Sequence, residues 1–337
     1  MRVLVIGQGL AGTLFSHAAL EKGWDCHVID AGYASASAVA AGMFNPMSFR
    51  RVVEVWDAER HLSSMKATYS ALSDQLGEQL IHFLPIHKRL SNSDYAALWN
   101  RQATTLKWIE PVTYQQGTAN EGIVHGGGWV NLPRLLHLWR AQLSLQNRFE
   151  RRALSQRDID NLNNGAWDAF VDCRGMHLRN APETPRMDLR GNRGEILTLA
   201  SQDAPALPSS YILNFGKWTL PIGPNQWRLG ASYEWKRQDI EPNPETADFL
   251  LHALKNAVPH SASLRVQSHE VGVRPVSKDR RPMVGPCPER PKWHIFNGLG
   301  TRGVLIGPKW ANLLVDIVIG DAQTPDIVNP KRLVFPV

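Results

Sequence analysis

The stretch VLVIGQGLAG, residues 3–12, decides the fold because it joins an apolar strand to a glycine-rich turn and the start of a helix. Its glycines follow the pattern GxGxxG: Gly7, Gly9 and Gly12. In such a motif the first glycine permits a tight turn, the second lets the backbone approach a pyrophosphate, and the third allows the helix to pack closely on the strand. Phosphates bind at the helix N-terminus, here Leu10 and Ala11. The pattern therefore predicts a dinucleotide-binding site.

The residues after this motif complete a strand–helix–strand unit. Residues 10–22 have helical composition and end at Gly23, and DCHVIDAG (25–32) has the pattern of a second strand. Asp30, followed by Ala31, closes that strand about 20 residues after the motif, where a carboxylate binds a ribose hydroxyl. The motif does not distinguish NAD from FAD.

The length and composition indicate a globular chain of two domains. The 337 residues are 43% hydrophobic and 20% charged, and this length exceeds that of one hydrophobic core. The net charge of +6 is spread over the chain, which fits a solvated surface but leaves a basic patch for nucleic acid open. Three widely spaced cysteines predict neither a disulfide framework nor a zinc site, so we expect no metal. The strand-like first residues and the lack of an apolar run of about 18 residues predict a cytoplasmic protein without a membrane span.

Later segments alternate between helical and strand patterns. Residues 54–80 and 246–257 have helical patterns. Stretches punctuated by glycine and proline have strand patterns: GIVHGGGWVNLP (122–133), GEILTL (194–199) and WRLGASYEW (227–235). KWHIFNG (292–298) predicts another strand, and a last helix is expected from Gly303. This order predicts a nucleotide-binding domain that is interrupted by a more antiparallel domain and completed by the C-terminal segment.

NGLGTRGVLIGPKW, residues 297–310, is a second glycine-rich turn that opens a helix. Free backbone N–H groups and the positive end of the helix dipole would face whatever lies in front of it. An ordinary glycine-capped surface helix has the same pattern, so both interpretations stay open on the residues alone.

Several segments, in order along nearly the whole chain, resemble the D-amino-acid oxidase and glycine oxidase (DAO) superfamily of FAD-dependent oxidoreductases. They are SAVAAGMFNP (37–46), GGGWVN (126–131), FVDCRG (170–175), RGNRGEIL (190–197), WTLPIGPNQWRLGASYE (218–234), VGVRPVSKDRRPMVGP (271–286) and NGLGTRGV (297–304). The resemblance implies an α/β fold with a Rossmann-like FAD-binding domain and a second, largely antiparallel substrate domain, as in the glutathione-reductase-type fold. It places the FAD-binding domain at residues 1–75, 127–185 and 268–337, and the substrate domain at residues 76–126 and 186–267.

The same resemblance implies that FAD is bound non-covalently. Beyond the N-terminal motif, the residues that would contact it are Ser37, Ala41, Gly42, Met43, Cys173, Gly175, Gly300, Thr301, Arg302, Gly303 and Val304. In this family the second glycine-rich helix start faces the flavin, and its N–H groups would stabilise the negative charge that the flavin gains on reduction. Some relatives tether flavin through a cysteine in the region of Cys287, but the offset of that residue within VGPCPERP (284–291) does not match.

The resemblance places three residues at the substrate. Arg274 falls on the family arginine that binds the substrate carboxylate, and a planar bidentate pair would fix the direction of the Cα–H bond. Trp218 stands where glycine oxidase-like members carry a tyrosine, which leaves the substrate open, and a core tryptophan is an equal alternative. Arg302, in the second glycine-rich turn, is the third. The family chemistry requires no base on the enzyme.

The resemblance implies an FAD-dependent oxidoreductase acting on the C–N bond of an amino acid or amine, either glycine-like or an N-substituted glycine. Hydride transfer to flavin N5 would be followed by hydrolysis of the imine. A tRNA partner is the alternative, because VSKDRRPMVG (276–285) and NPKRLV (329–334) are similar to the domain that releases glyoxylate from carboxymethylaminomethyl-uridine at the tRNA wobble position. A flavin-bound structural protein is a third hypothesis. The sequence gives neither the electron acceptor nor the oligomeric state.

Overall fold

The computed structural model describes residues 1–118, 120–201, 207–259, 261, 264–288 and 290–335. A six-stranded sheet has the order β10-β2-β1-β11-β18-β17. Its strands, in chain order, are β1 (Arg2–Ile6), β2 (Asp25–Ile29), β10 (Phe149–Glu150), β11 (Ala169–Asp172), β17 (Met283–Cys287) and β18 (Arg290–Asn297). Neighbours are parallel except β17, which is antiparallel to β18. Together with α1 (Leu10–Glu21), β1 and β2 form the predicted strand–helix–strand unit, and the α/β fold is confirmed.

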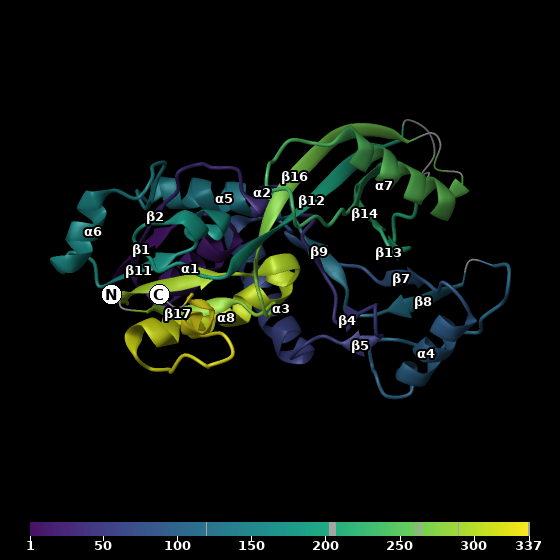
Figure 1. Ribbon diagram of the computed structural model, residues 1–337, viewed down its shortest axis with the longest axis horizontal. Coiled ribbons are helices and arrows are strands. Elements are labelled where there is room, and N and C mark those ends of the chain that lie inside the picture. The colour runs from purple at the N-terminus through teal and green to yellow at the C-terminus, as the bar shows by residue number, and fades with distance from the viewer. Residues whose placement is uncertain (119, 202–206, 260, 262–263, 289, 336–337) are drawn as a thin grey trace.

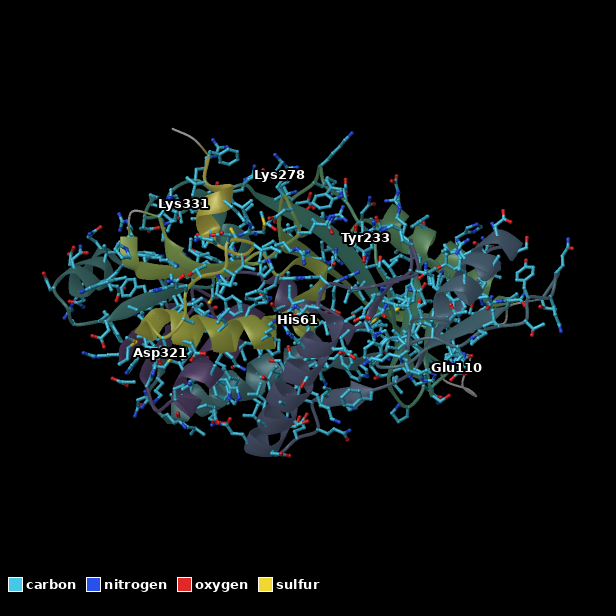
Figure 2. The ribbon with its side chains drawn as sticks, turned by 90° about the horizontal axis from the view of Figure 1, so that it is seen from below. His61, Glu110, Tyr233, Lys278, Asp321 and Lys331 are labelled. Atoms are coloured by element: carbon cyan, nitrogen blue, oxygen red, sulfur yellow. The ribbon has the colours of Figure 1, made fainter. Side chains whose placement is uncertain are left out.

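A seven-stranded sheet has the order β16-β12-β15-β14-β13-β7-β8. Its strands are β7 (Ile86–Arg89), β8 (Glu121–Val124), β12 (Leu189–Ala200), β13 (Ile212–Asn214), β14 (Trp218–Gly223), β15 (Gln226–Gly230) and β16 (Arg265–Ser277). All neighbours are antiparallel except β13 and β7. Figure 1 shows this sheet with α7 (Pro244–Ala257) toward one end of the molecule and the six-stranded sheet with α1 toward the other. Figure 2 shows the molecule from below, with its side chains. The domain boundaries given above stay a prediction.

Short strands and further helices connect the two sheets. The short strands are β3 (Met43–Phe44), β4 (Met47–Ser48), β5 (Val53–Glu54), β6 (Ile81–Phe83) and β9 (Gly128–Val130). The remaining helices are α2 (Ala36–Val39), α3 (Ala58–Leu76), α4 (Ser93–Ala103), α5 (Leu132–Leu145), α6 (Gln156–Asn163) and α8 (Gly303–Ile319), with 3₁₀ turns η1 (Gly175–Asn180), η3 (Gly300–Arg302) and η4 (Pro330–Leu333). Among the described residues, every helix is too short or too polar to cross a membrane.

The end of the strand-like stretch 122–133 differs from its sequence pattern. Asn131 ends the strand character there: its side chain accepts a hydrogen bond from the Arg134 N–H and so caps α5, with Pro133 in the first turn. Asn92 and Ser155 cap α4 and α6 in the same way. The sequence analysis did not identify these three helices, although α5 has the helical spacing of buried residues that would have revealed it: Leu132, Leu135, Leu136, Trp139 and Leu143.

Two of the helices meet at glycine residues. Gly303 and Gly307 of α8 face α1, since a Cβ atom on them would lie 3.1 Å from Leu10 Cδ2 and 2.6 Å from Leu14 Cδ1. Side chains at these positions would push the helices apart, so the glycines permit the close approach. The N-termini of α1 and α8 therefore lie near each other, and both open onto the same cavity.

Candidate active site

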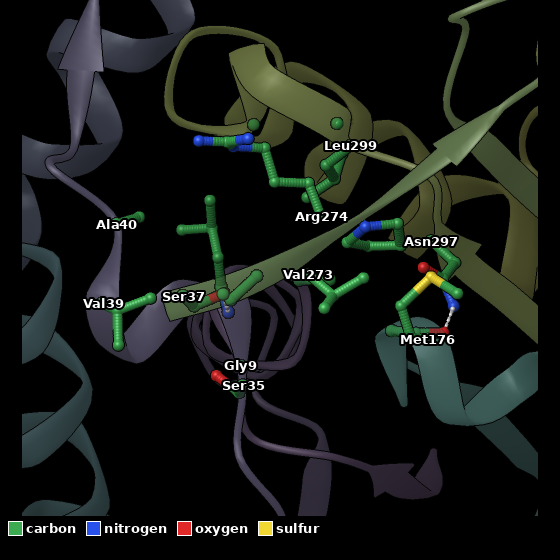
Figure 3. Close-up of a pocket in the computed structure, with 18 of the residues that line it drawn as sticks. Gly9, Ser35, Ser37, Val39, Ala40, Met176, Val273, Arg274, Asn297 and Leu299 are labelled. Atoms are coloured by element: carbon green, nitrogen blue, oxygen red, sulfur yellow. Dashed lines mark hydrogen bonds between the residues drawn. The ribbon is translucent and has the colours of Figure 1, made fainter. Parts of the chain in front are cut away.

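A cavity of about 1260 Å³ lies between the two sheets. Its volume exceeds the roughly 300–1,000 Å³ that is usual for small-molecule sites, so it has room for an elongated ligand. In Figure 3, Gly9 and Ser35 lie at one side of this cavity and Arg274 and Leu299 at the other.

The N-terminus of α1 forms one end of the cavity. Gly7 has a φ of +98°, and a Cβ atom there would lie 2.9 Å from the Cys173 carbonyl oxygen, so only glycine fits without displacement. A Cβ atom on Gly12 would overlap the Gly7 carbonyl oxygen, which is the close helix–strand packing expected of the third glycine. The Leu10 N–H donates to Ser37 Oγ at 3.0 Å. The first turn of α1 is thus uncharged, and its positive dipole end opens onto the cavity.

Asp30, the predicted ribose contact, directly follows β2 and lines the cavity. Its Oδ2 atom accepts from the Gln8 N–H at 2.6 Å, and its Oδ1 atom accepts from the Gly32 N–H at 2.7 Å. These bonds fix the carboxylate on the cavity wall, and each oxygen keeps lone pairs for a hydroxyl donor.

Small residues make up the wall between the two ends. Gly42 has a φ of +73°, and a Cβ atom there would overlap the Val130 carbonyl oxygen, so this segment runs directly against β9. A Cβ atom on Gly272 of β16 would lie 2.6 Å from Val39 Cγ2. Gly42, Val39 and Gly272 all line the cavity, and the two glycines allow neighbouring segments to approach closely in its wall.

The N-terminus of α8 begins beside that of α1, where Gly303 meets Leu10, and faces the second end of the cavity, which Arg274 lines. Gly300 has a φ of +57°, and η3 leads directly into α8 at Gly303. The first turn of α8 is uncharged, and Gly303 and Val304 line the cavity. Backbone N–H groups and a positive dipole end are therefore directed at this end as well.

Arg274 lies at this second end. Its Nη1 donates to Asn192 Oδ1 at 3.0 Å, and its guanidinium lies 5.0 Å from the centre of the Tyr233 ring. Gly194 makes room for it, because a Cβ atom there would overlap the guanidinium. Burial lowers the pKa of Arg274, which Tyr233 partly opposes. Within the described part of the chain, no carboxylate lies within 4.0 Å of this guanidinium, so its remaining N–H groups can bind an anion.

Arginine dominates the charge of the cavity. Among its described lining residues, one is an aspartate, Asp30, and six are arginines: Arg152, Arg174, Arg179, Arg186, Arg274 and Arg302. Arg152 pairs with Asp158 and Arg174 with Asp172. The other four form no ion pair within the described residues, so the cavity favours a ligand with several negative charges.

The structure brings the predicted site residues together. Those lining the cavity are Gly7, Gly9, Leu10, Ala11, Asp30, Ala31, Ser37, Ala41, Gly42, Met43, Cys173, Gly175, Trp218, Arg274, Gly300, Thr301, Arg302, Gly303 and Val304. Gly12 lies behind this wall, against Gly7. Their individual roles stay predictions.

Sequence reasoning missed Asn192 and Tyr233 as individual residues. Asn192 reaches Arg274 because β12 pairs with β16 in a register that places the two opposite each other. In the sequence Asn192 is one of several polar residues within RGNRGEIL (190–197), and only the structure shows that it is 1% exposed. Among the described residues, no group of three or more His, Cys, Asp or Glu side chains that could hold a metal ion is found.

The profile of the DAO family, described as FAD dependent oxidoreductase, matches residues 2–317. The chain belongs to this family. As a DAO-family enzyme it is an FAD-dependent oxidoreductase, and the cavity fits that cofactor. The glycine cradle at the α1 N-terminus suits a pyrophosphate, Asp30 a ribose, and the α8 N-terminus a group that gains negative charge.

Curated relatives of this DAO-family chain carry the name tRNA 5-methylaminomethyl-2-thiouridine biosynthesis bifunctional protein MnmC. The protein from Idiomarina loihiensis is 25% identical over 358 residues, with 95% of this chain and 56% of the relative covered. That from Legionella pneumophila (strain Corby) is 22% identical over 314 residues, covering 85% of this chain and 45% of the relative. This chain therefore spans about half the length of these relatives.

Solved structures of the same fold include two amine-oxidising enzymes. Glycine oxidase from Geobacillus kaustophilus has a TM-score of 0.80 at 16% identity, with 99% of each chain covered. Iminodiacetate oxidase from Chelativorans sp. BNC1 has a TM-score of 0.79 at 19% identity, with 98% of this chain and 99% of the other covered. At this identity the likeness confirms the predicted fold class and leaves the substrate to the residues of the site.

Proposed function

We propose that the protein oxidises the C–N bond of an N-substituted glycine or a glycine-like amino acid. The observation that carries this proposal is Arg274, a guanidinium on the wall of the cofactor cavity that lies beyond reach of every described carboxylate. A cation in such a place is costly unless an anion binds it, and a carboxylate matches its planar fork. The folds of glycine oxidase and iminodiacetate oxidase agree with this substrate class.

The residues of the chain orient the substrate. Arg274 would hold the carboxylate by two parallel hydrogen bonds and thereby direct the Cα–H bond into the cavity. Trp218 lines the cavity and would form an apolar wall beside the amine, with one N–H donor. The α8 N-terminus would stabilise developing negative charge on the ring system in front of it. FAD, when bound, supplies the hydride acceptor.

We infer that FAD is held without a covalent bond. Cys173 lines the cavity, but burial raises the pKa of its thiol, which keeps it protonated and a weak nucleophile. Cys287 is buried on β17, outside the set of described residues that line the cavity.

A tRNA-borne glycine unit is the second candidate substrate. The names of the curated relatives support it, and so does a hollow of about 420 Å³ beside the cavity. Arg179, Arg186 and Arg190 line that hollow together with the exposed rings of Trp235 and Phe335. Arginines with accessible aromatic rings are the groups that bind single-stranded RNA.

The test is anaerobic bleaching of the flavin absorption band of the holoenzyme. Sarcosine, glycine, D-alanine and hypomodified tRNA are added separately to the native protein, to Arg274→Ala and to Arg51→Ala, a control at an exposed arginine. We expect a glycine-type amine to bleach the native protein and Arg51→Ala, and Arg274→Ala to react about 10²–10³-fold more slowly, as for loss of a buried charge partner. Bleaching by tRNA alone would transfer the proposal to the second substrate. Equal rates in the two variants would overturn the role of Arg274.

A further inference from the structure

The substrate end of the cavity contains a second arginine. Arg302 is the N-cap residue of α8, whereas Arg274 comes from β16, and both line the cavity. The two segments are joined by a β-bridge between Val276 and Leu299. Tyr233 also lines the cavity, with its ring centre 5.0 Å from the Arg274 guanidinium, and it acts to raise the pKa of both arginines.

Arg302 lies among groups that increase the local positive potential. The cavity walls lower the pKa of Arg302 by desolvation, and Arg280 lowers it further, while Tyr233 opposes both effects. The positive dipole end of α8 begins at the next residue, Gly303. In the described part of the chain, Arg302 forms neither an ion pair nor a side-chain hydrogen bond, although its side chain is accessible.

The Arg274 guanidinium can bind one carboxylate by itself. Asn192 and the Tyr233 ring hold Arg274 from one side, which leaves a fork of N–H donors for a single carboxylate. Arg302 is then an additional, unneutralised cation at the same end. Two fixed cations match a ligand with two anionic groups, and such a match gives specificity more than it gives binding strength.

We propose that the substrate is an N-carboxymethyl amine with a second anionic group, of which Arg274 binds the glycine carboxylate and Arg302 binds the second anion. This proposal rests on the proposed function and names its substrate class. The second anion is the carboxylate of a small diacid or a phosphodiester of RNA, because a guanidinium binds either in the same bidentate way.

Two ligands that lack the reactive nitrogen allow the binding of the second anion to be measured without turnover. Methylthioacetate carries one carboxylate and thiodiglycolate carries two, and sulfur replaces the amine in both. Their dissociation constants are measured on the oxidised holoenzyme by perturbation of the flavin absorption spectrum. The proteins compared are the native enzyme, Arg302→Gln, Arg302→Lys, Arg274→Gln and, as the exposed control, Arg51→Gln.

We expect the native enzyme to bind thiodiglycolate about 10–100-fold more tightly than methylthioacetate, the gain typical of a hydrogen-bonded charged group. Arg302→Gln should lose most of this ratio and Arg302→Lys only part of it. Arg274→Gln should weaken both ligands. Equal binding of the two ligands by the native enzyme would overturn the assignment of Arg302 while leaving the proposed function intact. Weak binding of both ligands that Arg274→Gln does not change would contradict the proposed function itself.

Two more measurements separate the remaining roles of Arg302. A lowered flavin reduction potential of ligand-free Arg302→Gln, with an unchanged ratio of the two dissociation constants, would show that this arginine acts on the cofactor and would overturn the proposal.

The source of the second anion is tested by competition between thiodiglycolate and an anticodon stem–loop RNA. If the RNA competes with thiodiglycolate in the native enzyme and Arg302→Gln abolishes this competition, the second anion is a phosphodiester. If iminodiacetate displaces thiodiglycolate and the RNA has no effect, the second anion is the carboxylate of a small diacid.

Discussion

The N-termini of α1 and α8 use the same backbone device in different surroundings. Each begins after a glycine-rich turn, each has an uncharged first turn, and each opens onto the same cavity. The α1 end is enclosed by small side chains, and Ser37 accepts its first N–H. The α8 end is flanked instead by Arg302 and, from β16, by Arg274. We interpret the difference through the proposed roles: backbone N–H groups would suffice for the unchanging pyrophosphate of the cofactor, whereas charged side chains would select the substrate.

The largest effect is expected from a substitution that displaces the glycine-rich turn at the α1 end. In Gly12→Ala the new methyl group overlaps the Gly7 carbonyl oxygen, so the turn must move. We expect a loss of about 3 kcal/mol in the free energy of unfolding, at the upper end for overpacking, together with loss of bound FAD. Urea denaturation and the flavin-to-protein absorbance ratio measure the two effects.

Gly23→Ala is the matched control for that substitution. Gly23 follows the C-terminal end of the same helix with a φ of +74°, and a Cβ atom there would have open space within 4 Å of every described neighbour. It should cost only about 1 kcal/mol from backbone strain and keep its FAD. Equal FAD loss in both variants would contradict a specific role for the α1 turn.

Acid should lower the stability of the folded protein through protonation of His61, which packs against α8 at Trp310. This residue of α3 is fully buried beside Trp56 and Trp310, and its pKa is lowered to about 4, mainly by burial and further by Lys309 and Arg281, with Asp57 opposing. The unfolded chain therefore binds more protons between pH 6.5 and 4, and stability is lost as the pH falls through this range. The loss amounts to about 3 kcal/mol at most.

His61→Phe should make the protein less sensitive to acid. We expect the decrease in unfolding free energy between pH 7 and pH 4.5 to be smaller by about 2 kcal/mol than in the native protein. Burial also lowers the pKa of His294 to about 4, so part of the decrease in unfolding free energy at low pH should remain in this variant. The exposed His137→Gln serves as control, and the same pH dependence in both variants would exclude His61 as the source.

Substitution of Asn192 should change the α8 end with a smaller effect, because it acts on the position of Arg274 alone. Replacement by leucine removes the acceptor that holds Arg274, which should raise KM for a glycine-type amine about 10-fold with a smaller change in kcat. Stability should hardly fall, since Asn192 Nδ2 is buried without a hydrogen-bond partner among the described residues. Asn192→Asp should raise KM further, because its carboxylate would compete for Arg274. An unchanged KM in both variants would contradict a positioning role.

The smallest effect is expected where the two helices meet. In Gly307→Ala the added methyl group would lie 2.6 Å from Leu14 Cδ1, so the helices must separate slightly, while alanine favours the helix by about 1 kcal/mol over glycine. The two effects should nearly cancel in stability, within about 1 kcal/mol. FAD affinity should fall about threefold as the two N-termini move apart, and Leu14→Val in the same chain should restore it.

The sequence predicted the α1 end better than the substrate end. The glycines, the helix and Asp30 follow one another within a single local unit, so their spacing could be read directly. Arg274 and Trp218 depended on a resemblance to known enzymes. Asn192 could not be placed at all, because it meets Arg274 through the pairing of two strands that are 82 positions apart at this point. Tyr233 could not be placed for a different reason: it follows β15 outside any regular element, so no periodic pattern predicts that its ring lies beside Arg274.

The order of strands in the six-stranded sheet constrains how the chain can fold during synthesis. Among the strands of this sheet β1 is made first, yet it lies between β2 and β11, and β11 is covered by β18, which contains residues 290–297. A nascent chain must therefore keep the open edge of β11 from pairing elsewhere until β18 has also been made, more than 100 positions later. Such late closure slows folding and exposes a strand edge to aggregation. Truncated versions that end before β18 should be captured by chaperones rather than accumulate as a folded domain.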